Sequence, residues 1–127
     1  MKFSNTIKDL ICETVSLERV IDAIEKRQVL VINYDGSTPG GSGIREIEPV
    51  AIGRSKSGNL VLRAWQREGA SHRFYLKKRP IPGWRLFRLD KILSAKPTKE
   101  NFDEIRPNYN LQGDKSMKSI LRIAKFL

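Results

Sequence analysis

Hydrophobic and polar residues alternate along the middle of the chain with the period of half-buried β-strands. The alternation is clear in the stretch 83–92, where Phe87 and Leu89 fall on one face and Arg88 and Asp90 on the other. A β-branched apolar run predicts a strand buried on both faces over residues 29–34, and further strands are expected over residues 44–54, 60–67, 73–76 and 84–93. Most of the chain is therefore expected to form β-structure.

Turn residues separate the expected strands. Residues 55–59 predict a hairpin turn, and Pro49 indicates an edge position or a bulge because proline cannot donate to a sheet ladder. Residues 35–43 hold four glycines and one proline, which predicts a connecting loop. This loop lacks the Gly-Lys-Ser/Thr ending of a phosphate-binding loop, so we expect no such role for it.

Helical periodicity appears on both sides of the strands. Residues 4–14 and 16–27 each carry an apolar stripe, and Ser16 is a suitable N-cap for the second helix. A short turn of helix is expected from residue 98 to residue 105. In residues 115–127, one helical stripe collects Met117, Ile120, Leu121, Ala124 and Leu127. We expect one or two N-terminal helices and a C-terminal helix, and hence a mostly β, α+β fold.

Length and composition narrow the class of protein. A chain of 127 residues fits one domain, and 39% hydrophobic with 30% charged residues indicates a soluble globular chain. No apolar run approaches the ~20 residues that span a bilayer, and no signal peptide is recognisable, so a cytoplasmic protein is expected. One cysteine and one histidine argue against a disulfide framework and against a zinc site built from those ligands, and no metal or cofactor is expected.

The net charge of +10 is concentrated in the middle of the chain. Residues 54–91 contain eleven Lys and Arg against only Glu68 and Asp90, a net charge of +9, whereas residues 1–53 carry six basic and eight acidic residues, net −2. Such asymmetry favours an anionic partner, with nucleic acid first and a nucleotide next. A generally basic protein without such a partner is the alternative.

Two of the expected strands present arginines in a pattern suited to binding. Arg63, Trp65 and Arg67 share one face, where an indole can stack on a base while guanidinium groups neutralise phosphates. The alternative is a partly covered tryptophan packed against arginines. Arg88, on the strand over residues 84–93, is suited to grip a phosphate, but it can equally pair with Asp90 as a structural partner.

Four segments, in this order, resemble the WYL domain family, which is named for a Trp-Tyr-Leu triplet. They are Ala23-Ile24 leading into 29–34, Arg45-Glu46-Ile47-Glu48-Pro49, the segment 58–65 and Phe87-Arg88-Leu89-Asp90-Lys91-Ile92. The similarity covers residues 16–95. Two departures stand out: the triplet position reads Leu60-Val61-Leu62, and Lys91 replaces the usual arginine.

The resemblance implies a small SH3/Sm-like β-barrel over residues 1–97, with residues 98–127 as a C-terminal extension. It also implies a module that binds nucleic acid or nucleotide-like ligands in prokaryotic regulators and defence systems, or in their viruses. The ligand residues of the family carry over to Arg45, Arg63, Arg85, Arg88 and Lys91. The roles of the triplet's Trp and Tyr do not carry over.

Together these observations predict a non-enzymatic nucleic-acid-binding regulatory module that prefers single strands over duplexes. Phosphate contacts are expected from Arg63, Arg67, Arg73, Arg85 and Arg88, with Trp65 stacking on a base. No nucleophile and base are spaced for catalysis.

Two other functions stay open. One is a sensor of a nucleotide or another small anion beside Arg45 and Arg88. The other is an interaction protein, for example a viral one, that binds its partner through the basic face. The tail over residues 115–127 is open to three roles, namely packing on its own domain, forming a homodimer, or binding a membrane surface, of which the last is the least expected.

Overall fold

A computed structural model of the protein describes residues 15–36, 42–69, 82–104, 106–109 and 114–126. These residues form helix α2 (Leu17–Glu25), six strands and a short 3-10 helix, η1 (Leu89–Lys91). The strands are β1 (Gln28–Tyr34), β2 (Gly43–Arg54), β3 (Leu60–Gly69), β4 (Gly83–Arg88), β5 (Ile92–Asn101) and β6 (Ser119–Ile123). The helix expected over residues 4–14, the strand expected over 73–76 and Arg73 lie outside the described residues.

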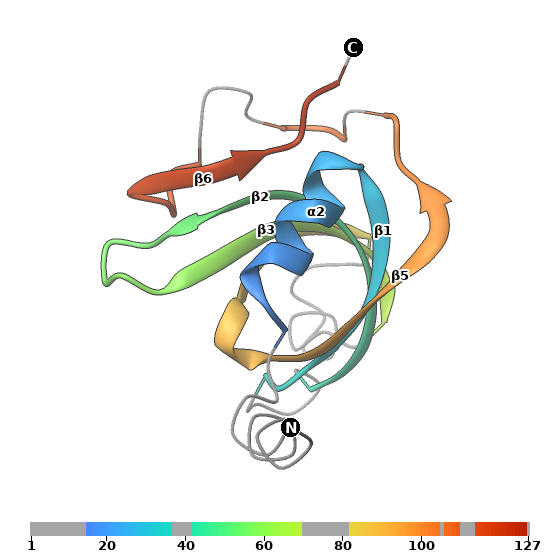
Figure 1. Ribbon diagram of the computed structural model, residues 1–127, viewed down its shortest axis with the longest axis horizontal. Helices are drawn as coiled ribbons and strands as arrows, with labels where there is room; N and C mark the ends of the chain where they lie inside the picture. Colours follow the sequence, from blue (N-terminus) through green and yellow to red (C-terminus); the bar gives the residue numbers. More distant parts are fainter. Residues whose placement is uncertain (1–14, 37–41, 70–81, 105, 110–113, 127) are drawn as a thin grey trace, which may run out of the picture.

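The strands form one antiparallel sheet in the order β4-β3-β2-β1-β5, with β6 paired to β2. Figure 1 shows a strongly curved sheet with α2 lying across β1 and β2. Among the described residues β4 and β5 form no ladder with each other, so the expectation of a closed barrel is wrong. The sheet stays open because β4 and β5, the two ends of the strand order, pair only with β3 and β1.

Strand β2 changes partner along its length. Residues from Gly43 to Ile47 pair with β1, whereas residues from Ala51 to Arg54 pair with β6. Pro49 lies in the gap between the two ladders, and the pairing of β2 with β3 shifts register between Pro49 and Ala51. The predicted bulge is therefore confirmed, and proline is tolerated where β2 has no ladder on that side.

The stretch predicted as one strand over residues 84–93 consists of most of β4, η1 and the start of β5. Phe87 and Leu89 are buried, as the alternation predicted. Strand β5 then continues through Pro97 to Asn101, so the short helix expected from residue 98 is wrong. Pro97 fits because β5 is the last strand in the order and pairs only with β1 there.

The prediction of a C-terminal helix is also wrong, because residues 119–123 form strand β6. Its backbone pairs with residues 51–54 of β2, and Met117 and Ala124, at either side of the strand, are buried. Hydrogen bonds from Lys118 N to Arg54 O and from Ala124 N to Val50 O extend the attachment at both ends. An open sheet edge thus decides the conformation of a stretch whose apolar spacing alone favoured a helix. Self-association through residues 115–127 stays a prediction.

Helix α2 begins as predicted at Ser16, whose hydroxyl accepts a hydrogen bond from Arg19 N at 3.3 Å. Its buried residues Val20, Ala23 and Ile24 pack in the single hydrophobic core, and the helix contacts β1, β2 and β6. The apolar stripe of the second predicted helix therefore serves to pack the helix on the sheet.

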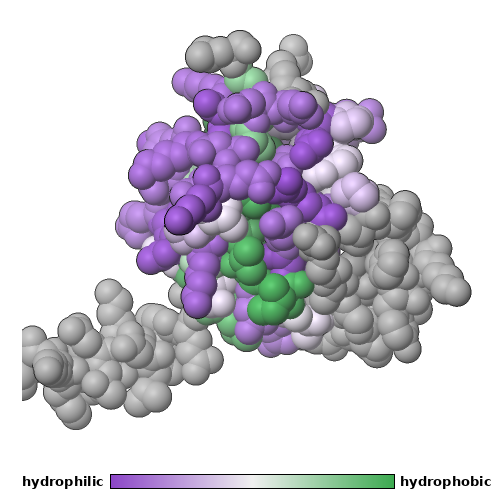
Figure 2. Space-filling view, turned by 90° about the vertical axis from the view of Figure 1, so that its right-hand side faces the viewer, coloured by the Kyte–Doolittle hydropathy of each residue, from purple (hydrophilic) through white to green (hydrophobic). Residues whose placement is uncertain are grey.

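The surface at the right of Figure 1 is mostly hydrophilic, with a narrow strip of hydrophobic side chains (Figure 2). The large hydrophobic residues that are exposed among those described are Ile44, Leu86, Leu93 and Ile120. No helix within the described ranges is long and apolar enough to cross a membrane.

Candidate functional site

Side chains along strand β3 alternate between the two faces of the sheet, and the candidate residues lie on both faces. Leu62, Ala64 and Gln66 are buried on what we call the inner face, whereas Arg63, Trp65 and Arg67 are partly exposed on the outer face. Pairing places Arg85 beside Ala64, on the inner face, and Trp84 beside Trp65, on the outer face. The arginines predicted as one binding surface therefore belong to two separate sites.

Arg45 and Arg85 lie on the inner face, and both residues are buried although their side chains are charged. The Arg45 guanidinium lies over the ring of Tyr34, 4.9 Å from its centroid, and over the ring of Phe87 at 5.2 Å. Its Nη1 donates a hydrogen bond to Gln66 Oε1 at 3.2 Å. We call Arg45 and Arg85, with Tyr34, Gln66 and Phe87, the inner-face arginine cluster.

Burial and a neighbouring positive charge both act on the Arg45 guanidinium of this cluster. Burial lowers the pKa of Arg45 to about 10, and the positive charge of Arg85 acts in the same direction, while Tyr34 opposes it. A guanidinium whose pKa is lowered by burial and by a second cation is stabilised by any anion that approaches it. The planar fork of arginine suits phosphate or carboxylate oxygens in particular.

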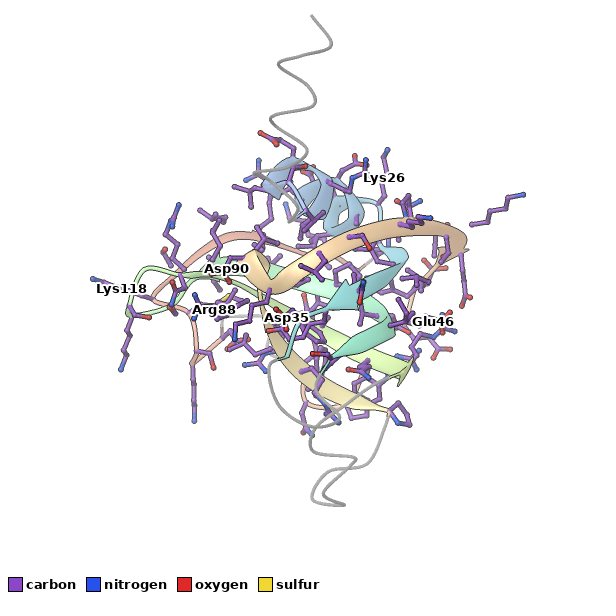
Figure 3. The ribbon with its side chains drawn as sticks, turned by 90° about the horizontal axis from the view of Figure 1, so that it is seen from below. Lys26, Asp35, Glu46, Arg88, Asp90 and Lys118 are labelled. Carbon is purple, nitrogen blue, oxygen red and sulfur yellow. The ribbon has the colours of Figure 1, made fainter. Side chains whose placement is uncertain are left out.

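Arg88 lies at the end of β4, next to this cluster. Its backbone N donates to the Tyr34 hydroxyl at 3.0 Å, so Tyr34 connects Arg88 with Arg45. The Arg88 side chain forms two hydrogen bonds with Asp90, at 3.1 and 2.7 Å, which raise the pKa of Arg88 (Figure 3). Asp90 is therefore the structural partner of Arg88, one of the two possibilities that the sequence left open.

Exposure separates Arg88 from the buried arginines. Its side chain is 44% exposed, so it remains accessible to a ligand. Lys91 follows on η1 and is partly exposed, and its side chain makes no ion pair with any described residue. Arg88 is thus placed at the rim of the cluster through its contact with Tyr34.

On the outer face, acidic residues from distant parts of the chain neutralise Arg63 and Arg67. Arg63 binds Asp114 through Nε and Nη2, at 2.6 and 3.1 Å. Arg67 contacts Glu100 at 2.7 Å, which raises the pKa of Arg67. Both arginines were expected to contact phosphates, and both have carboxylate partners in the folded chain.

Glu48 is the centre of this outer-face network, and the sequence analysis missed it. Only 1% of its side chain is exposed, and both of its oxygens accept hydrogen bonds from Arg106, at 2.9 and 2.5 Å. Arg67 Nε lies 3.5 Å from the same carboxylate. A glutamate in a strand whose other residues are largely buried was the available signal.

Trp65 packs against two side chains of its own domain. The ring of Trp84 meets it edge-on at 5.4 Å, and the guanidinium of Arg106 lies 5.5 Å from its centroid. These contacts favour the packing alternative for Trp65 over base stacking. Within the described ranges, no three His, Cys, Asp or Glu residues lie together in a way that would hold a metal ion.

The Arg63–Asp114 pair predicts a pH dependence of stability. Burial alone raises the pKa of Asp114, but hydrogen bonds from Arg63 and Ser116 outweigh it and place the pKa below the ordinary 3.8. A lowered folded-state pKa stabilises the protein at neutral pH, and that stabilisation is lost as the pH falls below 3.8 through the folded-state pKa. We expect Asp114→Asn to cost about 1–2 kcal/mol at neutral pH, because both partners are only partly exposed.

Urea denaturation of wild type and Asp114→Asn at about pH 7 and about pH 3 measures this effect. The difference between the two proteins should shrink at the lower pH. An unchanged difference would show that the carboxylate makes no ionic contribution.

Comparisons with known proteins agree with this fold. The chain is similar to proteasome accessory factor B/C (PafBC) of Arthrobacter aurescens, with a TM-score of 0.55 and 18% sequence identity, over 75% of this chain and 13% of that one. The chain thus spans only a small part of the length of that protein. No curated protein matches it. The WYL domain family matches over residues 15–97, which confirms the resemblance seen in the sequence. The chain therefore belongs to the WYL domain family.

Proposed function

We propose that the protein is a non-enzymatic regulatory module that binds a phosphate-bearing small ligand of the nucleotide class at the inner-face arginine cluster. The observation that carries the proposal is the burial of Arg45 and Arg85 close enough together for the charge of one to lower the pKa of the other. Two guanidinium forks on the same face of the sheet can offer paired donors to the oxygens of one phosphate.

The aromatic rings of the cluster support a preorganised site. Tyr34 and Phe87 meet edge-on at 4.9 Å and hold the Arg45 guanidinium over their faces. Such cation–π contacts fix the fork before a ligand arrives, so little side-chain entropy is lost on binding. Arg88 at the rim pairs with Asp90 in an exposed setting, where ion pairs are weak and can be exchanged for a ligand phosphate.

The outer face is a poorer candidate for this role. Its arginines already have carboxylate partners, and Trp65 is packed against Trp84 and Arg106. A phosphate would have to displace those partners.

A thermal-shift and calorimetric comparison of adenosine, adenosine monophosphate and a ten-nucleotide single strand tests the proposal. Saturable stabilisation by the mononucleotide, with none by the uncharged nucleoside, is the expected result. If neither the mononucleotide nor other phosphate compounds such as pyrophosphate bind, the proposed ligand class is wrong.

Arg85→Gln should weaken binding of the mononucleotide by about 10- to 100-fold, the range for losing charge-assisted hydrogen bonds. Arg85→Lys should recover only part of the loss, because an ammonium keeps the charge without the fork. Arg122→Gln is the matched control, since Arg122 is exposed and lies on β6. Equal losses for Arg85→Gln and Arg122→Gln would indicate non-specific charge attraction.

The net charge of +9 over residues 54–91 favours single-stranded nucleic acid as a second candidate. Binding of the ten-nucleotide strand alone, with a steep fall in affinity as salt rises, would support it. Removing one phosphate contact, for example with Arg88→Gln, should then reduce the slope of log affinity against log salt by about one.

A further inference from the structure

A separate cavity of about 280 Å³ lies on the outer face of the sheet, beneath the chain that follows β5. Val50 and Ala51 of β2 and Ile123 of β6 line it with aliphatic groups, and Trp84 and Tyr109 add aromatic rings. Since Arg45 and Arg85 belong to the inner face, this cavity is distinct from the site proposed above.

The two aromatic residues present carbon surface to the cavity, because their polar atoms are bound elsewhere. The Trp84 indole N–H donates to Pro107 O, and the Tyr109 hydroxyl donates to Ala124 O at 2.7 Å. Their ring centroids are 6.1 Å apart. A ligand between these walls is therefore held mainly by apolar and aromatic contacts.

One side of the cavity is cationic. Arg63 uses Nε and Nη2 to bind Asp114 and Ser116, whereas its Nη1 makes no hydrogen bond to any residue within the described ranges. Lys115 also lines the cavity. The lining thus holds two cations, Arg63 and Lys115, and one carboxylate, Asp114. Asp114 already accepts hydrogen bonds from Arg63 and from Ser116 N, so one positive charge is left without a counter-charge in the lining.

We propose that this cavity binds a small aromatic carboxylate, with its ring against Trp84 and Tyr109 and its acid group on Arg63 Nη1 and Lys115. The volume fits such a ligand: benzene fills an apolar cavity of about 150 Å³, so 280 Å³ leaves room for one ring and a short acid side chain. The ligand class differs from the proposed nucleotide, and the two sites are independent.

Isothermal titration of the full chain with phenylacetate tests this proposal, with phenylacetamide and acetate as probes that lack the charge or the ring. Phenylacetate should bind saturably and about tenfold or more tightly than either, because each probe loses one of the two contact types. Binding of the acid and the amide with equal affinity, or no binding of phenylacetate, would overturn the proposal.

Two variants that fill the cavity complete the test. Ala51→Leu and Ile123→Phe enlarge side chains that line it and leave Arg63 intact, so either folded variant should lose phenylacetate binding. Arg63→Lys should weaken binding while keeping a cation opposite Asp114. Arg85→Gln, on the inner face, should bind phenylacetate as the wild type does. Wild-type affinity in the folded cavity-filling variants would contradict the assigned site, and Ile123→Phe decides the question if Ala51→Leu does not fold.

Discussion

Replacing Glu48 with alanine is expected to lower the free energy of unfolding by about 3 kcal/mol, the lower end of the range for breaking a buried ion pair. The side chain is 1% exposed, and its carboxylate accepts two hydrogen bonds from Arg106 and lies 3.5 Å from Arg67 Nε. Alanine leaves these two cations facing each other without the anion between them. The lower end of the range applies because both arginines keep more than a quarter of their side chains exposed to water.

Chemical denaturation of Glu48→Ala measures this loss, and Glu46→Ala is the matched control. Glu46 lies two residues earlier on the same strand and also contacts Arg67, but its side chain is 28% exposed. We expect the control to change stability by no more than about 1 kcal/mol, as exposed ion pairs do. Similar losses in the two variants would show that burial of Glu48 is not what makes it important.

Gly53→Ala is expected to destabilise the protein by about 2–3 kcal/mol or more, as overpacking of a closed contact does. A Cβ at this position overlaps the carbonyl oxygen of Ser119 and lies 2.9 Å from Met117 Sδ and 3.1 Å from Ile120 Cα. The first and third of these atoms belong to the β6 backbone, which cannot move away without breaking its ladder with β2. Strand β6 should therefore detach before the rest of the sheet unfolds.

Amide hydrogen exchange separates this local effect from general loss of stability. In Gly53→Ala, exchange should accelerate in residues 119–124 more than in β1 or β3. Gly58→Ala is the control: its φ of +90° makes alanine strained, but a Cβ there meets nothing within 4 Å. We expect Gly58→Ala to lower the free energy of unfolding by about 1 kcal/mol. Amide exchange in β6 should then accelerate no more than in the other strands. Unaltered protection of β6 in Gly53→Ala would contradict the steric argument.

Local patterns were enough to predict β1, β2, β3 and the hairpin turn between the last two. They failed at η1 because Leu89 is buried in the turn, as it would be in a continued strand, so the alternation shows no break. They failed again at β6, because Met117 and Ala124 fit an apolar helical stripe as well as the two ends of a strand. The unpaired edge of β2 decides between the two conformations, and no local pattern reports it.

The arginines of the inner face were identified from charge and from the family resemblance, but their separation from the outer-face arginines was not. Whether an arginine is available depends on carboxylates that are distant in the sequence: Asp114 for Arg63, and Glu100 for Arg67. Sequence spacing does not predict these pairs. The same applies to the cavity beneath Tyr109, which exists only because the C-terminal chain folds back over the sheet.

The change of partner along β2 also imposes an order on folding. During synthesis, the first half of β2 meets β1 and β3 soon after they emerge, whereas Ala51 cannot pair with Ile123 until the chain has been made as far as residue 123. Until then residues 51–54 offer a free sheet edge to any other extended chain. Truncated chains that end before residue 119 cannot form β6 and leave this edge unpaired. Edge-to-edge aggregation is therefore the form of misfolding expected of them.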